Sequence, residues 1–285
     1  MAMITLIGAG GKMGCRLTDN LRKSTNLVSY VEISESGIRR LAERGITPSL
    51  QEDAVPEADA VILAVPDVAI GDVSRTVVPL MKPGAMLIVL DPAAAFLDKL
   101  PVHNDVTYFV THPCHPPVFN DEDQEARTDY FGGIKAKQAI VCALVQGPEE
   151  DYARGEALAA EMYAPVMRSH RITLEQMAML EPTMAETISS MLVTVLGEAM
   201  EEAVKRGVPY DAARDFMLGH VNIQLAIVFG EAGNPFSDAC KIAIEYGKRY
   251  MLKEGWQRLY DPEKVYEQVD VMLHPEKLNT LSLEG

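Results

Sequence analysis

The sequence is poor in basic residues and has no paired cysteines, and each absence excludes a class of protein. Its 285 residues carry 26 Lys and Arg against 41 Asp and Glu, a net charge of −15. This excess of acid argues against nucleic acids and anionic membranes as partners. The four cysteines are scattered with no CxxC pair, which is typical of reduced thiols in a cytosolic protein. We therefore expect a cytoplasmic protein that acts on a small molecule.

Membrane and targeting segments are also missing from the sequence. The longest uncharged run of the C-terminal half, residues 216–230, contains His220, Asn222 and Gln224 and is shorter than the roughly 20 apolar residues of a membrane span. A buried helix at a domain or subunit interface suits this run better, and we expect a homodimer. The first residues show no basic leader or cleavage site of a signal peptide.

What the sequence does contain is an alternation of apolar runs and amphipathic segments. Apolar runs at residues 4–7, 60–65, 86–90 and 106–111 predict buried strands, and residues 27–33 and 139–145 predict two more. From residue 149 onward almost everything has helical spacing. We expect a Rossmann-type doubly wound parallel sheet in residues 1–165, followed by an all-helical substrate and dimerisation domain in residues 166–285.

Residues 4–14 are the stretch around which the chain is organised. A short apolar strand enters a glycine-rich turn, and Leu17 and Leu21 then follow at helical spacing. Such a unit places a dinucleotide pyrophosphate on backbone N–H groups at a helix start. The register Gly8, Gly10, Gly14 is one residue too long for the usual motif, so we favour a frame with Ala9 in the first glycine position. The cofactor-binding residues expected in the turn are Ala9, Gly10, Gly11, Lys12, Met13 and Gly14.

An acidic residue supports this interpretation and indicates which dinucleotide binds. Glu32 stands at the end of the second predicted strand, 18 residues after Gly14. A carboxylate there accepts hydrogen bonds from the ribose hydroxyls and repels the 2′-phosphate of NADP. No Arg or Lys lies between Glu32 and Ile38. We predict NAD as the cofactor.

Ligands of such a sheet lie beyond the carboxyl ends of its strands, where Asp67, Asp91 and His112 fall. His112 and His115 belong to the proline-rich motif Thr-His-Pro-Cys-His-Pro-Pro at residues 111–117. A histidine there can take the proton of an alcohol or bind a metal through a neutral nitrogen. In an extended segment the two rings point in different directions, so their spacing leaves open whether both bind the same metal. A rigid proline loop that carries two surface histidines is the other possibility.

Glu181 is the second candidate, because it shares a helical face with Met177, Met184 and Ile188. Burying a carboxylate on an apolar face is costly unless a cation or a metal meets it. The alternative is a carboxylate at the entrance of a new helix that begins at Pro182.

Together these motifs resemble the β-hydroxyacid dehydrogenase and 6-phosphogluconate dehydrogenase-like superfamily. Within it, residues 111–120 and 180–186 look most like the D-apionate oxidoisomerase family. The resemblance implies NAD-dependent oxidation of a branched sugar acid, D-apionate, with rearrangement to 3-oxo-isoapionate. The lysine usual in sugar-acid members is absent from the start of the long helix, where Glu181 stands. This departure favours a divalent metal of the zinc or magnesium class.

The resemblance also implies roles for individual residues. His112 is expected to be the general base or a metal ligand, Glu181 a metal ligand and His115 the alternative ligand, while Asp67 orients the ribose or the nicotinamide. Two other functions stay open: a simple NAD-dependent β-hydroxyacid dehydrogenase without isomerisation or metal, and a non-catalytic NAD-binding regulator.

Overall fold

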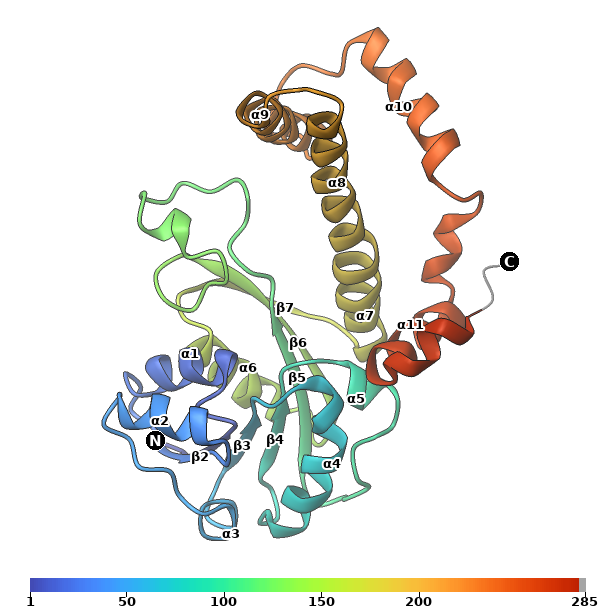
Figure 1. Ribbon diagram of the computed structural model, residues 1–285. Coiled ribbons are helices and arrows are strands. Elements are labelled where there is room, and N and C mark those ends of the chain that lie inside the picture. Colours follow the sequence, from blue (N-terminus) through green and yellow to red (C-terminus); the bar gives the residue numbers. More distant parts are fainter. Residues whose placement is uncertain (282–285) are drawn as a thin grey trace. The chain divides into compact units, whose positions relative to one another are not determined.

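The computed structural model describes residues 1–281 and contains one seven-stranded sheet. The strand order is β2-β1-β3-β4-β5-β6-β7, and all neighbouring strands are parallel except β5 and β6 (Figure 1). The Rossmann-type sheet predicted from the sequence is confirmed. The strands are β1 (Met3–Ile7), β2 (Leu27–Val31), β3 (Ala60–Leu63), β4 (Met86–Val89), β5 (Thr107–Pro113), β6 (Gln138–Gln146) and β7 (Val166–Arg171).

Helices cover both faces of the sheet because its central strands are apolar on both sides. All residues of β3 and β4 are buried. One face packs against α1 (Lys12–Leu21), α2 (Glu35–Ala42) and α6 (Asp151–Met162). The other packs against α3 (Gln51–Ala54), α4 (Asp67–Val77), α5 (Ala93–Phe96) and α7 (Leu174–Ala178). Short 3₁₀-helices lie at Val78–Leu80 (η1), Ala126–Thr128 (η2), Trp256–Tyr260 (η4) and Pro275–Thr280 (η5).

The described chain divides into two units. The first comprises residues 1–180 together with residues from 266 onward, and the second comprises residues 181–265. β7, which the sequence did not predict, extends the sheet past residue 165 because it pairs in parallel with β6. Most of α11 (Pro262–Leu273) belongs to the first unit, where Val269 packs against Ala93 and Leu97.

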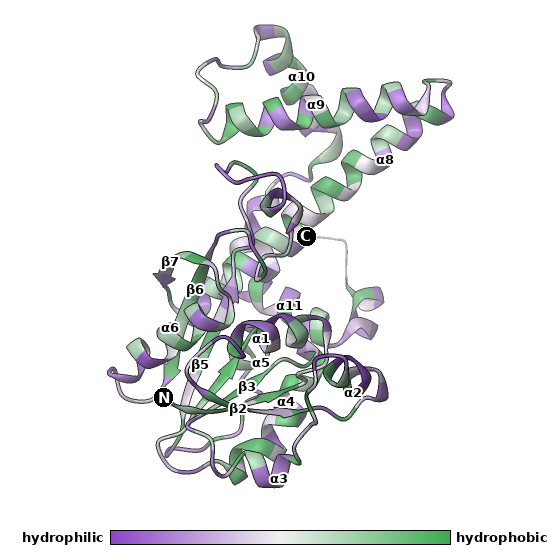
Figure 2. Ribbon diagram, turned by 90° about the vertical axis from the view of Figure 1, so that its left-hand side faces the viewer, coloured by the Kyte–Doolittle hydropathy of each residue, from purple (hydrophilic) through white to green (hydrophobic). Residues whose placement is uncertain are grey.

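The second unit is helical and exposes much apolar surface. It contains most of the π-helix η3 (Met179–Ser190), together with α8 (Met191–Lys205), α9 (Tyr210–Val228) and α10 (Asp238–Met251). Of all residues in α8, α9 and α10, which are fully described, only Ala213 is buried. Phe216, Ile242 and Tyr250 are 70%, 72% and 76% exposed. Figure 2 shows apolar residues distributed along α8 and α9.

The structure supports the sequence argument against a membrane span. Within residues 1–281, every helix is too short or too polar to cross a bilayer.

Candidate active site

The glycine turn joins β1 to α1 and brings bare backbone to the start of the helix. Gly8 has φ +77°, and a Cβ there would lie 2.4 Å from the Ala64 carbonyl oxygen. A Cβ on Gly14 would lie 2.0 Å from the Gly8 carbonyl oxygen, so only glycine lets α1 approach the strand this closely. The residue of the turn with left-handed backbone is therefore Gly8. The register favoured from the sequence had instead placed Ala9 in the first glycine position of the motif. Gly11 caps α1 with extended backbone, leaving the first N–H groups of this ten-residue helix available to an anion.

Glu32 is fixed beside this turn by backbone donors. Its Oε2 accepts a hydrogen bond from the Gly10 N–H at 3.0 Å, and its Oε1 accepts from the N–H groups of Ile33 and Ser34 at 2.9 and 2.8 Å. Arg40 donates from Nε to the Gly10 carbonyl at 2.6 Å. The carboxylate is partly exposed next to the turn, where the ribose hydroxyls of a dinucleotide are bound in this fold.

At the carboxyl ends of β4 and β5, three metal-ligating side chains converge. Asp91, His112 and Glu181 each offer one ligand atom, and these atoms lie within 4.8 Å of one another. Asp91 is buried, whereas His112 and Glu181 are partly exposed. Two of the three, His112 and Glu181, are candidates that the sequence also indicated. His115 is not a member of this group.

Hydrogen bonds to backbone set the orientation of two of these side chains. His112 Nδ1 lies 2.8 Å from the Leu90 carbonyl oxygen. Because a carbonyl only accepts, Nδ1 donates this hydrogen bond, and in the neutral ring the lone pair is on Nε2. The Asp91 carboxylate accepts a hydrogen bond from the Ala93 N–H at 2.7 Å through Oδ1. Both contacts belong to the chain segment that follows β4.

The position of Glu181 follows from α7. This helix begins at a capping box between Thr173 and Gln176 and buries Met177 in the core of the first unit. Pro182 has no N–H to donate to the carbonyl four residues earlier, so an α-helix cannot continue regularly through it. The chain instead forms the π-helix η3, and Glu181 lies in its first turn. π-Helical turns are found frequently at functional sites.

Other predicted residues lie around this group. His115 has its ring centroid 6.0 Å from that of His112 in a T-shaped arrangement. Asp67 is exposed in the first turn of α4, and Lys12 is exposed in the first turn of α1. Desolvation raises the pKa of the Cys114 thiol, which disfavours a nucleophilic thiolate.

Asp91 belongs to this group although the sequence did not indicate it as a ligand candidate. In the sequence it is one of several polar residues at strand ends. The signal that could have found it is its place directly after the buried run of β4, in the strand that pairs with β5 and so lies beside His112.

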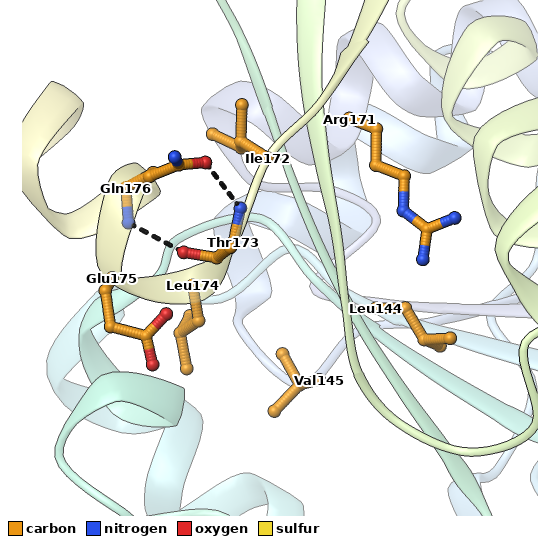
Figure 3. Close-up of a pocket in the computed structure, with 8 residues that line it drawn as sticks. All are labelled: Leu144, Val145, Arg171, Ile172, Thr173, Leu174, Glu175 and Gln176. Atoms are coloured by element: carbon orange, nitrogen blue, oxygen red, sulfur yellow. Dashed lines mark hydrogen bonds between the residues drawn. The ribbon is translucent and has the colours of Figure 1, made fainter.

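A separate cavity of about 370 Å³ opens where β7 leads into α7. Figure 3 shows its lining, with the two reciprocal hydrogen bonds of the capping box between Thr173 and Gln176. Arg171, at its rim, forms a two-pronged ion pair with Glu149. None of the residues of the glycine turn or of the Asp91 group lines this cavity.

Comparisons with known proteins agree with this geometry. Residues 3–94 match the NAD binding domain of 6-phosphogluconate dehydrogenase, and residues 120–273 match the C-terminal domain of decarboxylating phosphogluconate dehydrogenase. The chain is 53% identical to a D-apionate oxidoisomerase of Cupriavidus necator and 51% identical to one of Rhizobium rhizogenes, over 93% of this chain and 97% of each relative.

A crystal structure from Cupriavidus necator is similar over nearly the whole chain. It is described as a semialdehyde dehydrogenase NAD-binding protein in complex with calcium and NAD. The identity is 52% and the TM-score is 0.93, with 95% of this chain and 99% of that chain covered.

The fold, the glycine turn and the family matches define an NAD-dependent oxidoreductase of the 6-phosphogluconate dehydrogenase-like class. Within this class, the chain belongs to the D-apionate oxidoisomerase family. An enzyme is thereby supported over the non-catalytic regulator that the sequence had left open.

Proposed function

We propose that this enzyme oxidises D-apionate with NAD and rearranges it to 3-oxo-isoapionate, with the help of a divalent cation. The observation that carries the proposal is the convergence of Asp91, His112 and Glu181 within 4.8 Å. The names of the relatives, at 42% to 53% identity, support the substrate. When bound, NAD supplies the hydride acceptor and the cation supplies a Lewis acid for the substrate oxygens.

The chain's own groups fit NAD. The N–H groups at the start of α1 meet the pyrophosphate, and the close approach at Gly8 and Gly14 leaves no side chain in the way. Glu32 accepts hydrogen bonds from the adenosine ribose, and its charge disfavours a 2′-phosphate. Asp67, in the first turn of α4, orients the ribose or the nicotinamide.

The donor set also fits a divalent cation. Two carboxylates and one neutral imidazole suit magnesium, manganese, calcium or zinc. The Leu90 carbonyl keeps the His112 ring in the tautomer that a ligand needs, and the Ala93 N–H orients the Asp91 carboxylate. Calcium in the Cupriavidus necator structure supports this assignment. His115 lies outside this donor set.

The overall reaction balances as sugar acid plus NAD⁺ giving the rearranged keto acid, NADH and one proton. Oxidation removes a hydride from the carbon and a proton from its hydroxyl. The rearrangement then moves a hydroxymethyl group with its bonding electrons to the new carbonyl carbon. The neighbouring tertiary alcohol loses its proton and becomes the ketone, while the former carbonyl oxygen takes up a proton and becomes a hydroxyl. The protein must therefore accept protons at the substrate oxygens, and His112 Nε2 is poised to do so whenever it is not a ligand.

Chelation followed by product analysis tests this proposal. We expect the purified enzyme to form NADH and 3-oxo-isoapionate from D-apionate, to lose this activity in EDTA and to regain it with one divalent ion. NMR of the product separates rearranged from unrearranged keto acid. Full turnover in EDTA to an unrearranged product would instead establish the simple β-hydroxyacid dehydrogenase.

We also propose that the enzyme is a cytoplasmic homodimer formed through α8, α9 and α10. The support is the exposed apolar surface of these helices, which an isolated chain would leave in water. A groove of about 560 Å³ between α8 and α9 is lined by apolar residues that include Met200 and Phe216. Obligate dimer interfaces are of this apolar kind.

A further inference from the structure

The backbone at His115 has an unusual conformation for a residue with a side chain. Its φ is +60°, and within residues 1–281 only Asp98 shares a positive φ among the residues other than glycine. A β-carbon makes this left-handed region unfavourable, although histidine is tolerated there more often than most residues. His115 also precedes Pro116, and a residue before proline is steered towards extended backbone of negative φ. Its local sequence therefore opposes the conformation that it adopts.

Contacts with a distant loop hold His115 in this conformation. Its Nδ1 lies 2.9 Å from the Phe131 carbonyl oxygen, and its ring meets the Phe131 ring edge-on at 6.3 Å between centroids. The Phe131 ring is in turn contacted by Arg16, whose guanidinium carbon lies over the ring, 4.5 Å from its centroid. The N–H of Cys114 is bonded to the Ala139 carbonyl, which fixes the chain one residue earlier. Strained residues held in this way by their surroundings cluster at functional sites.

The same contacts determine what the His115 ring offers. Because the Phe131 carbonyl can only accept, Nδ1 is the donor of this bond, and in the neutral ring Nε2 is the nitrogen that accepts a hydrogen bond. No residue in the described part of the chain donates to this Nε2. The ring is partly exposed and stands against His112, whose Nε2 belongs to the group with Asp91 and Glu181. The two imidazoles therefore meet edge to face, one within the ligand group and one outside it.

We propose that His115 binds the substrate, its Nε2 accepting a hydrogen bond from a hydroxyl group of the sugar acid. This assignment rests on the proposed function of the site. It adds that the His115 ring recognises a hydroxyl group of the substrate. It separates the roles of the two histidines: His112 acts at the reacting oxygens, and His115 selects for a polyhydroxy acid.

The variant His115→Gly tests the proposal, since glycine accepts the left-handed backbone and removes only the ring. We expect the Kd of D-apionate, measured by calorimetry on the NAD-loaded enzyme, to rise about tenfold, which corresponds to about 1.4 kcal/mol. The KM for NAD should stay unchanged. Asp98→Gly is the matched control, because it relieves the other left-handed residue, and its kinetics should equal those of the wild type.

Substrate analogues make the test specific. In the wild type, removal of the hydroxyl that His115 binds should weaken binding about tenfold, and in His115→Gly removal of the same hydroxyl should cost nothing more. Wild-type affinity for D-apionate in the His115→Gly variant would overturn the proposal, as would an equal loss for every analogue together with a lowered melting temperature. Wild-type enzyme that binds D-apionate without turning it over would refute the proposed reaction and leave the role of His115 intact.

Discussion

Asp91 and His112 both receive their orientation from backbone groups of the segment after β4. The Leu90 carbonyl accepts a hydrogen bond from His112, and the Ala93 N–H donates one to Asp91, so backbone groups help to orient both side chains. Side chains held by backbone lose little freedom when they take up a ligand, which favours binding.

Asp91→Asn should therefore damage the site without damaging the fold. The amide oxygen can still accept from the Ala93 N–H, but the charge that attracts a cation is gone. We expect the affinity for the divalent ion to fall at least about tenfold, and turnover with it. Metal titration and steady-state assays measure the two effects, with the exposed Asp105→Asn as the control. An unchanged metal affinity would contradict a role for Asp91 as a ligand.

Glu32→Gln should weaken the preference for NAD. Glutamine keeps the length of the side chain but carries no negative charge to repel a 2′-phosphate. We expect the ratio of kcat/KM for NAD to that for NADP to drop about tenfold, or about 1.4 kcal/mol. Glu35→Gln, a change at an exposed carboxylate of α2, should leave the ratio unaltered. The result that would count against this role is an unaltered ratio in Glu32→Gln.

At the scale of elements, the site is assembled where strands end and helices begin. β4 and β5 are neighbours in the sheet, so the residues after them meet although some 20 positions separate them in sequence. α7 supplies the third side chain, since the π-helix that contains Glu181 begins where α7 ends. A substitution that destabilises the start of α7 should therefore change the position of the Glu181 side chain.

Thr173→Ala tests this coupling. It removes the hydroxyl that accepts from the Gln176 N–H and so half of the capping box. We expect a loss of about 1 kcal/mol of stability and a reduced kcat, because α7 no longer fixes the start of η3. Thermal unfolding and kinetics are to be compared with Thr76→Ala, whose hydroxyl also bonds to backbone but in α4. If both variants retain wild-type turnover, α7 does not control the site.

At the scale of the whole molecule, the two units differ in how they are stabilised. The first has two buried cores, one on each face of the sheet. The three long helices of the second unit bury a single residue, and isolated helices of such lengths gain their stability from packing rather than from propensity. A second copy of the chain is the partner that is always available to cover them.

Phe216→Glu should disrupt the proposed dimer. The ring is 70% exposed on α9 and stacks on His220 at 4.0 Å between centroids. A carboxylate in an apolar interface would be costly to bury, so we expect monomers or loss of the folded second unit. Light scattering after size-exclusion chromatography measures the mass, and Arg214→Glu on the same helix is the control. A monomeric wild type would refute the dimer outright.

The sequence by itself determined the class of sheet and the glycine turn, and it named Glu32, His112 and Glu181 as candidates. These follow from local patterns: apolar runs mark covered strands, and polar residues after them mark the ligand edge. It did not determine the antiparallel β6, the strand β7 or the left-handed residue of the turn. Strand direction and pairing depend on contacts between distant segments, and no local pattern encodes them.

Only the tertiary structure decided which polar residues meet. Asp91 stood in the sequence as one of several acids at strand ends, and it became a ligand candidate because β4 lies next to β5. His115 lies outside this group, and the Phe131 carbonyl, sixteen residues away, holds its ring. A metal or substrate site requires several side chains within a few ångströms, and such distances are set by packing rather than by spacing along the chain.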